Sequence, residues 1–453
     1  MIKTGWPITK KERNILLSIS FALVIYLTGC GGGGGSPSAS DDSNDDDPPL
    51  PATWTGNQVL QLTSGGLLTP RIQAFQEDED QMGLLYFEDA QSGGGEYDLK
   101  KIVFQSAGAQ AGAVMVDEHI VTIDNCKTLA TARNVNGDYI VAYQGGEVKD
   151  CGGEEQADAM FSMESNGTWE EYTGAIGEVE RNPVFHDGLA GGDMSLVNDS
   201  SGNIHLCFQF YYEGCDTMNA NYPDLNYVKK RAGDPSAYVA EEQVEGNTYY
   251  TGGGIQNNVG HHCKMILDQD ENPVIFYYAE LPGGLKGLRM ARKINNVWVK
   301  SWVESGIEVG AIACARDENG NLGVAYYVVN YEDPSTNEVS PACLRYAQNS
   351  LSQFTTWTCR MVDDTTLCGK FPSLAFNPSG QPGIAYFEEE TYSGYSLQNL
   401  KLAIYNGQSW GLETAASTGN IGYYNNLWFG EDDTPFISTY SESEKKIYLF
   451  HKS

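Results

Sequence analysis

Histidines and neighbouring acids are the residues of this sequence that could transfer protons or hold a metal ion. His261, His262 and Cys263 follow one another, and His186 is followed by Asp187. A histidine beside a carboxylate can act as a general acid or base. Adjacent residues of a strand point to opposite sides, however, so His261 and His262 cannot easily bind one ion. We therefore favour a role as polar residues that line the mouth of a channel, and predict no catalytic residue and no metal site.

A repeat of short β-rich runs provides the elements that position these residues. The clearest unit covers residues 371–415, where such runs alternate with turns at 377–381 and Asn406-Gly407. Runs of this kind predict antiparallel hairpins. An aromatic residue, preceded by alanine in the clearest cases, marks the second strand of seven units, at Tyr86, Tyr143, Phe208, Tyr277, Tyr326, Tyr386 and Tyr440. Their spacing of roughly 50–70 residues is typical of four-stranded blades.

The ends of the repeat region predict how it closes. The last unit reaches Ser453 after three strands, whereas the region begins at Trp54 with what looks like an isolated fourth strand. Pairing the first strand with the last unit would remove two free sheet edges. We therefore predict an all-β fold for residues 52–453, a seven-bladed β-propeller with four-stranded antiparallel blades and a one-plus-three ring closure. A tandem of β-sandwiches is the alternative, and it leaves the strand at Trp54 unexplained.

Residues 1–29 have the pattern of an export signal. Basic residues precede the apolar run 15–27, which is too short to span a bilayer comfortably. The run ends in Leu27-Thr28-Gly29-Cys30, which resembles the lipobox of bacterial lipoproteins. This resemblance implies a signal peptide over 1–29, diacylation of Cys30 and a lipid bilayer as a partner, because several acyl chains anchor a protein firmly. An uncleaved membrane anchor is the alternative.

Residues 30–51 are rich in Gly, Ser, Pro and Asp and cannot bury apolar surface, so we expect a flexible tether. Gly31 follows Cys30 at the position where an aspartate would imply retention in the inner membrane by the enterobacterial rule. We therefore expect an outer membrane lipoprotein, and leave open whether it faces the periplasm or the cell exterior.

The repeat region, residues 54–453, is similar to bacterial surface lipoproteins with propeller domains. The similarity is carried by Ser373-Leu-Ala and by Gly380-Gln-Pro-Gly-Ile-Ala-Tyr386, and it implies a fold more than a function. The Trp-Asp motif of WD40 blades is absent. The Ser-x-Asp-x-Gly-x-x-Trp box of sialidases belongs between third and fourth strands, whereas the Asp/Gly turns here follow first strands. The sialidase activity therefore does not carry over.

The chain is strongly acidic, with a formal net charge of −32. This charge repels nucleic acids and anionic lipid surfaces and argues against them as partners. It is compatible with bound cations, with a basic protein partner, or simply with high solubility. Clustered carboxylates suit calcium, but no Asp-x-Asp-x-Asp-Gly spacing occurs, so no cofactor is predicted.

Long polar loops gather on one rim of the predicted propeller, because connections between second and third strands share a rim with those between blades. This rim is acidic and rich in tyrosine, and long loops on a rigid scaffold often carry function. Tyrosines beside carboxylates suit carbohydrate stacking or a basic protein. Alternatively, they are loop anchors on a solvated surface. The candidate binding residues are Tyr211, Tyr212, Glu213, Tyr331, Glu332, Glu388, Tyr392 and Tyr395, together with His186, Asp187, His261 and His262.

Nine cysteines remain besides Cys30, and an exported protein can oxidise them. The predicted disulfides are Cys343–Cys359, Cys126–Cys151 and Cys215–Cys263. Cys207 alternates into a core strand and is predicted to be the odd, buried thiol. No Cys-x-x-Cys pair occurs, which disfavours zinc ribbons and c-type haem.

These observations favour a non-enzymatic, envelope-anchored binding or scaffold lipoprotein that engages a glycan or a protein through the long-loop rim. The first alternative is a polysaccharide-active hydrolase or lyase with its site at the channel mouth, and the second is an assembly factor for an envelope complex. A hydrolase would require two carboxylates roughly 5–10 Å apart across a pocket on the rim that carries His186 and His262.

Overall fold

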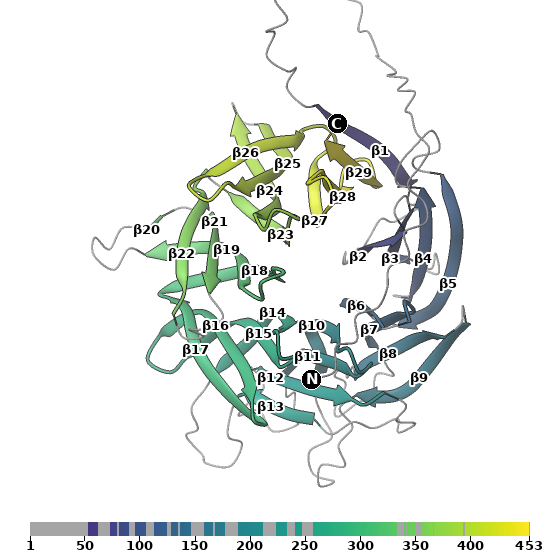
Figure 1. Ribbon diagram of the computed structural model, residues 1–453, viewed down its shortest axis with the longest axis vertical. Helices are drawn as coiled ribbons and strands as arrows, with labels where there is room; N and C mark the ends of the chain where they lie inside the picture. Colours follow the sequence, from purple (N-terminus) through teal and green to yellow (C-terminus); the bar gives the residue numbers. More distant parts are fainter. Residues whose placement is uncertain are drawn as a thin grey trace, which may run out of the picture. The chain divides into compact units, whose positions relative to one another are not determined.

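Figure 1 shows the computed structural model of the chain. The residues that it describes all belong to one compact unit, Ala52–Ser453. The structure describes residues 53–61, 73–78, 81–89, 96–105, 113–124, 128–134, 136–145, 158–165, 168–176, 189–211, 223–232, 241–246, 257–332, 339–340, 342–349, 356–365, 367–392 and 395–452. Within these ranges no helix is long and apolar enough to cross a membrane. The predicted signal peptide, the tether and Cys30 lie outside them and stay predictions.

Antiparallel sheets, each built from consecutive strands, form the first four blades. Blade 1 contains β2 (Gln73–Asp78), β3 (Gln81–Asp89), β4 (Glu96–Gln105) and β5 (Val114–Asp124). Blade 2 contains β6 (Leu129–Arg133), β7 (Tyr139–Gly145), β8 (Asp158–Ser165) and β9 (Thr168–Ile176). Blade 3 contains β10 (Leu189–Asn198), β11 (Ile204–Tyr211), β12 (Asp224–Lys230) and β13 (Glu241–Glu245). Blade 4 contains β14 (Asn258–Leu267), β15 (Pro273–Leu281), β16 (Leu285–Ile294) and β17 (Val297–Ser305).

Three further blades complete the ring. Blade 5 contains β18 (Ile307–Arg316), β19 (Leu322–Glu332), β21 (Cys343–Asn349) and β22 (Thr358–Asp363), and the short β20 (Val339–Ser340) pairs with β19. Blade 6 contains β23 (Cys368–Phe376), β24 (Pro382–Tyr392), β25 (Tyr395–Tyr405) and β26 (Trp410–Ala416). Blade 7 contains β27 (Ile421–Phe429), β28 (Pro435–Ser441), β29 (Lys446–Lys452) and β1 (Trp54–Gln61). The predicted seven-bladed propeller is confirmed.

In each blade the first strand lies innermost, around the central channel, and the fourth lies at the periphery (Figure 1). The second strands are nearly continuous buried runs, as in β15 and β28. They are covered on both faces by neighbouring blades, which explains their apolar composition. The aromatic residues that marked them in the sequence all lie on these strands and are buried.

The ring closes through β1, which pairs antiparallel with β29 so that Gln58 faces Tyr448. Val59 is 5% exposed and packs in a cluster that includes Met82 of blade 1 and Ile447 of blade 7. Pairing satisfies the outer edge of β29, which would otherwise present unpaired backbone groups. The predicted one-plus-three closure is therefore confirmed.

Ionic contacts join blades 3 to 4, 4 to 5 and 5 to 6 in one repeated arrangement, which we call the interblade clamp. A second-strand tyrosine and a third-strand base of one blade contact a carboxylate at the end of the preceding blade. The three clamps are Tyr277 and Arg289 with Glu245, Tyr326 and Arg345 with Glu304, and Tyr386 and Lys401 with Asp363. Burial raises the pKa of each of these tyrosines, so each hydroxyl stays a hydrogen-bond donor.

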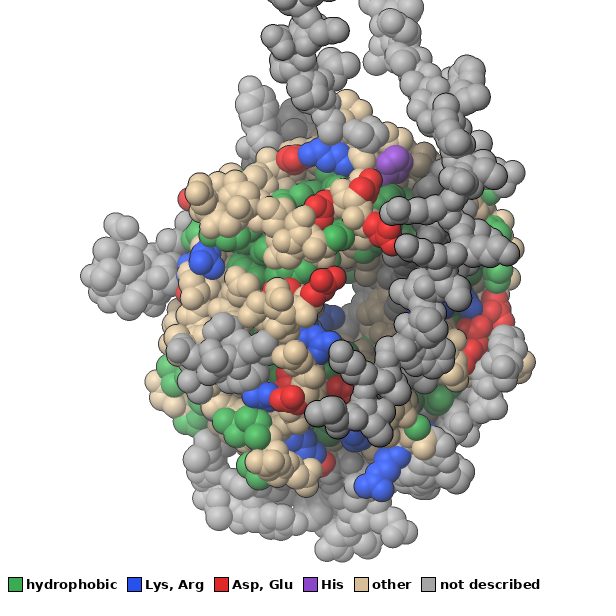
Figure 2. Space-filling view, viewed as in Figure 1, with side chains coloured by type: hydrophobic (Ala, Val, Ile, Leu, Met, Phe, Trp, Pro, Cys, Tyr) green, Lys and Arg blue, Asp and Glu red, His purple; other side chains and the backbone are tan. Residues whose placement is uncertain are grey.

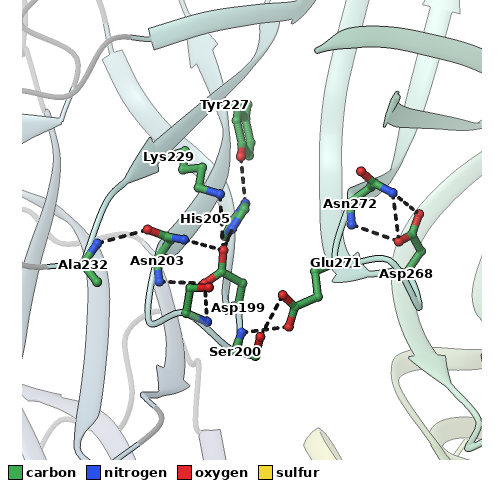
Figure 3. Close-up of polar contacts among 11 residues, drawn as sticks. Asp199, Ser200, Asn203, His205, Tyr227, Lys229, Ala232, Asp268, Glu271 and Asn272 are labelled. Atoms are coloured by element: carbon green, nitrogen blue, oxygen red, sulfur yellow. Dashed lines mark hydrogen bonds and ion pairs between the residues drawn. The ribbon is translucent and has the colours of Figure 1, made fainter. Parts of the chain in front are cut away.

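Turns between first and second strands are stabilised by their leading aspartate or asparagine, as the sequence pattern indicated. In blade 3, Asp199 accepts hydrogen bonds from the backbone N–H groups of Ser201 and Asn203 (Figure 3). Burial raises the pKa of Asp199, but hydrogen bonds from Asn203 and His205 outweigh burial, and the pKa lies well below its usual value. The backbone N–H and the hydroxyl of Ser200 donate hydrogen bonds to the Glu271 carboxylate, which belongs to the corresponding turn of the next blade. These bonds connect the two neighbouring turns.

The predicted disulfide between Cys343 and Cys359 is wrong, because both residues carry free thiols. Cys359 faces Ala347, four residues along β21 from Cys343. Pairing of Gln348 with Thr358 centres the hairpin turn at residue 353. Cys343 and Cys359 would face each other only if the turn were centred at residue 351, and the shift of two residues moves the opposing residue by four, about 13 Å along a strand.

Cys263 also carries a free, buried thiol, so its predicted disulfide with Cys215 is not present. The Cys263 thiol instead donates to the backbone carbonyl of Asp193, at 3.3 Å. Cys207 is free and buried, as predicted. Cys126, Cys151 and Cys215 lie outside the described residues.

Candidate functional site

A cavity of about 400 Å³ occupies the mouth of the central channel. It is lined mainly by first strands, from blades 1 and 3 to 7. Its charged and amide side chains include Asp193, His262, Lys264, Lys370, Asn425 and Asn426. A second cavity of about 240 Å³ shares Lys264, Asn425 and Asn426 and continues along the channel. Figure 2 shows the central opening with basic and acidic side chains at its edge.

The cavity opens on the rim that the sequence assigned to the long loops. Asp193, His262, Lys370 and Tyr424 all lie in the first half of their strands. In an antiparallel meander, the start of a first strand lies on the same rim as the connection between second and third strands. The channel mouth and the predicted working rim therefore coincide.

Bulges in three first strands direct side chains into this mouth. His262, Phe371 and Tyr424 all have left-handed backbone conformations, with φ of 57°, 51° and 55°. Each lies where the pairing with the second strand shifts register. Left-handed conformations cost a non-glycine residue of order 1–3 kcal/mol and often mark functional sites. The repetition of this cost around one cavity is the structural reason for placing the functional site here.

A glycine two residues before each bulged residue makes the bulge possible. Gly369 and Gly422 have φ of 102° and 108°, which disfavours any residue with a side chain. A Cβ on Gly369 would lie 3.0 Å from Leu344 Cα of the preceding blade. On Gly422 it would lie 2.7 Å from the backbone oxygen of Asn399. The glycines therefore allow the first strands to approach the neighbouring blades closely.

His262 and Asp193 form a histidine–carboxylate pair across the junction of blades 3 and 4. The His262 backbone N–H donates to Asp193 Oδ2 at 2.8 Å, and His262 Nδ1 lies 3.7 Å from the same oxygen. The His262 side chain is 36% exposed, so it remains accessible from the cavity. The sequence predicted His262 at this mouth but did not identify Asp193 as its partner.

His261 does not line the cavity. Its ring centroid nevertheless lies 6.2 Å from that of His262, because the left-handed bulge at His262 interrupts the strand alternation. The prediction that the two adjacent side chains point to opposite sides therefore does not hold here. His261 Nε2 contacts Asn258 Oδ1. Burial, with a smaller contribution from His262, lowers its pKa from 6.5 to about 4, and Asp193 only partly opposes this shift.

This lowered pKa predicts a pH dependence of folding. Because the folded state favours neutral His261, its contribution to stability is complete above pH 6.5 and is lost as the pH falls from 6.5 toward 4. We expect His261→Gln to lose less stability than the wild type between these pH values, as measured by urea unfolding. Equal slopes for His261→Gln and the wild type would contradict this assignment.

Aromatic rings of blades 6 and 7 form one wall of the mouth. The rings of Phe371 and Tyr424 lie 4.5 Å apart, and that of Tyr423 lies 5.2 Å from Phe371. Phe387 packs behind them, 4.9 Å from Tyr423. Phe371 and Tyr424 line the cavity itself, so the wall presents ring surface to a ligand.

The structure describes some of the predicted rim residues fully, others by their backbone alone, and others not at all. Tyr212, Glu213, His186 and Asp187 lie outside the described residues. For five others the structure places the backbone alone: Tyr211 ends β11, Tyr331 and Glu332 end β19, and Tyr392 faces Tyr395 across the β24–β25 hairpin. Glu388 is buried and accepts hydrogen bonds from Lys401 and Asn399. It therefore stabilises blade 6 instead of facing a ligand.

Sequence reasoning missed Asp193, Lys264, Lys370, Phe371 and Tyr424. A signal was present in the repeats Val259-Gly-His-His, Cys368-Gly-Lys-Phe and Ile421-Gly-Tyr-Tyr, each within a first strand. Comparing the first strands of the units would have revealed a glycine followed two positions later by a ring-bearing residue.

No family model and no curated protein matches this sequence. A solved structure described as an ulvan lyase from a new polysaccharide lyase family matches with 10% identity and a TM-score of 0.57, over 87% of this chain and 95% of that one. The two chains share a propeller fold. A second solved structure, of an ulvan lyase bound to -[GlcA(1-4)Rha3S]-, matches with a TM-score of 0.56 and 11% identity, over 87% of this chain and 95% of that one. A Hadza microbial sialidase matches at 0.43, with 13% identity over 78% of this chain and 72% of its own. At these identities the likeness establishes the propeller fold alone.

Proposed function

We propose that this protein binds a glycan in the mouth of its central channel. The observation that carries the proposal is the aromatic wall of Phe371 and Tyr424 inside a cavity that also contains lysines and amide side chains. Aromatic faces pack against the C–H surfaces of sugar rings, while polar groups fix hydroxyls, and ligand sites commonly combine the two. The fold shared with a polysaccharide lyase is consistent with this proposal.

The long-loop rim surrounds this mouth and extends the proposed binding surface. We place the protein in the outer membrane as a lipoprotein acylated at Cys30, on the strength of the lipobox-like sequence. In that location it would act as an envelope-anchored glycan receptor or scaffold.

Glycan cleavage is the second candidate function, and the His262–Asp193 pair favours it. Among the lining residues that the structure describes, Asp193 is the only carboxylate, so they do not supply the opposed pair that a hydrolase needs. A lyase needs a base to remove a proton from a sugar carbon, and a histidine beside a carboxylate can do this. Cleavage by elimination therefore fits the cavity better than hydrolysis does.

Binding is tested on a glycan array, followed by calorimetric titration of the best ligands. Tyr424→Asn keeps a residue type that tolerates the left-handed conformation and removes the ring. We expect it to weaken binding about tenfold, corresponding to about 1.4 kcal/mol. Tyr405 at the end of β25 packs against Trp410 away from the channel, so Tyr405→Asn should leave binding unchanged. Unchanged binding by Tyr424→Asn, or no glycan bound by the wild type, would refute the proposal.

Cleavage is tested by product analysis of the same glycans. A lyase would release unsaturated sugar ends, and His262→Asn should bind the glycan but form product at least about 100-fold more slowly, as expected on loss of a general base. His119→Asn is the matched control, because His119 lies on the outer strand β5 and is exposed. If the wild type binds without forming product, the protein is a binder; if His262→Asn retains full turnover, His262 is not the base.

A further inference from the structure

We infer that the glycan bound at the channel mouth is negatively charged, through carboxylate or sulfate groups, and that Lys264 and Lys370 bind this charge. This inference rests on the proposed glycan function and names the class of ligand.

The cavity has the opposite charge balance from the chain as a whole. Acidic residues outnumber lysine and arginine by 60 to 28 along the sequence. Among the described residues that line the cavity, however, the charged side chains are Lys264, Lys370 and Asp193. One carboxylate oxygen of Asp193 already accepts the His262 N–H. The lining therefore carries an excess of positive charge, which favours an anionic ligand.

The two lysines belong to different blades and line the same cavity. Lys264 lies on β14 of blade 4 and borders both channel cavities. Lys370 lies on β23 of blade 6, with its Nζ 3.9 Å from a carboxylate oxygen of Glu389. That ion pair is long, and the Lys370 side chain is 37% exposed, so solvent screens the attraction strongly. An anionic group entering the cavity can therefore compete for Lys370.

Lys370 also lies next to the aromatic wall. It directly precedes Phe371, and its Nζ is 5.9 Å from the ring centroid of Phe387. A sugar ring stacked on Phe371 or Tyr424 would thus hold an attached carboxylate or sulfate near the Lys370 ammonium. An ammonium supplies three hydrogen-bond donors to such an anion without fixing its geometry. Carboxylated and sulfated sugars share this chemistry.

The acidity of the remaining chain restricts how such a ligand binds. Net negative charge repels polyanions from the outer surface. Binding should therefore be confined to the channel mouth, and an anionic polymer should not coat the protein. This distinguishes a specific acidic-glycan site from general electrostatic adsorption.

Calorimetric titration with four oligosaccharide probes tests the inference: a glucuronate oligomer, its carboxyl-reduced form, a sulfated oligomer and its desulfated form. We expect the wild type to bind at least one charged probe about tenfold more tightly than its neutral partner. Lys264→Gln and Lys370→Gln should each remove most of that preference, because the charged probe loses more affinity than its neutral partner. Lys445→Gln provides the control, since Lys445 forms a surface ion pair with Glu442.

The outcomes separate the inference from the proposed function. If neutral and charged probes bind equally, or if both lysine variants keep the preference, the inference is wrong and glycan binding stands. If no probe and no other glycan binds, the proposed function itself fails. Should Lys264→Gln not fold, Lys264→Arg keeps the charge and should retain the preference. The pair of probes that shows the preference identifies carboxylate or sulfate as the group recognised.

Discussion

An aspartate in place of Val59 is expected to open the ring at its closure and to lower the free energy of unfolding by about 3 kcal/mol or more. Val59 is 5% exposed and packs between blades 7 and 1, among Met82, Leu84 and Ile447. A carboxylate there would lose its water without gaining a partner. Detachment of β1 would also expose the edge of β29, so the local cost spreads to the whole ring.

Urea unfolding followed by tryptophan fluorescence measures this effect. Gln58 is the matched control, because it precedes Val59 on the same strand and is exposed. Gln58→Asp should change the free energy of unfolding by less than about 0.5 kcal/mol. Equal stabilities of Val59→Asp and Gln58→Asp would show that the β1–β29 pairing does not hold the ring closed.

Removal of the Glu304 carboxylate should destabilise the junction of blades 4 and 5 by about 3 kcal/mol, the usual cost of breaking a buried ion pair. Glu304 is 14% exposed and lies 2.8 Å from Arg345, which is 13% exposed. The same carboxylate accepts a hydrogen bond from the hydroxyl of Tyr326, and the Tyr326 side chain is fully buried. Glu304→Ala leaves the Arg345 charge buried without its partner, and the unfolding midpoint in urea should fall accordingly.

Glu442→Ala is the control for this substitution. Glu442 pairs with Lys445 at 2.7 Å, but both side chains are more than 40% exposed. Solvated pairs contribute at most about 1 kcal/mol, so this variant should remain close to the wild type. If Glu304→Ala were as stable as Glu442→Ala, the clamps would not be what joins the blades.

The fold was predictable because its determinants are local and repeated. Tyr326 and Tyr386 each follow an alanine, Tyr277 occupies the same place in its unit, and each was assigned correctly to a second strand. Asp199 and Asp268 identified the turns, since their side chains bond the backbone two and four residues ahead. Such patterns depend on strand periodicity and turn chemistry, which the sequence expresses directly.

The site was predictable only in part. His262 could be assigned to the channel mouth because its place in the repeat is local information. Its partner Asp193 is 69 residues away and lies in another blade. The failed Cys343–Cys359 disulfide has a similar cause, because a small change in the centre of a turn changes which residues face each other.

By itself, the sequence determined the number of blades, the strand that closes the ring and the chemistry of the short turns, because alternating burial and turn residues act over a few positions. The tertiary structure alone decided which charged groups share the channel mouth. Lys264, Lys370 and Asp193 come from three blades. They meet because glycines such as Gly369 and Gly422 let bulged first strands press against their neighbours. Residues so far apart along the chain are brought together by packing around one axis, which strand periodicity does not encode.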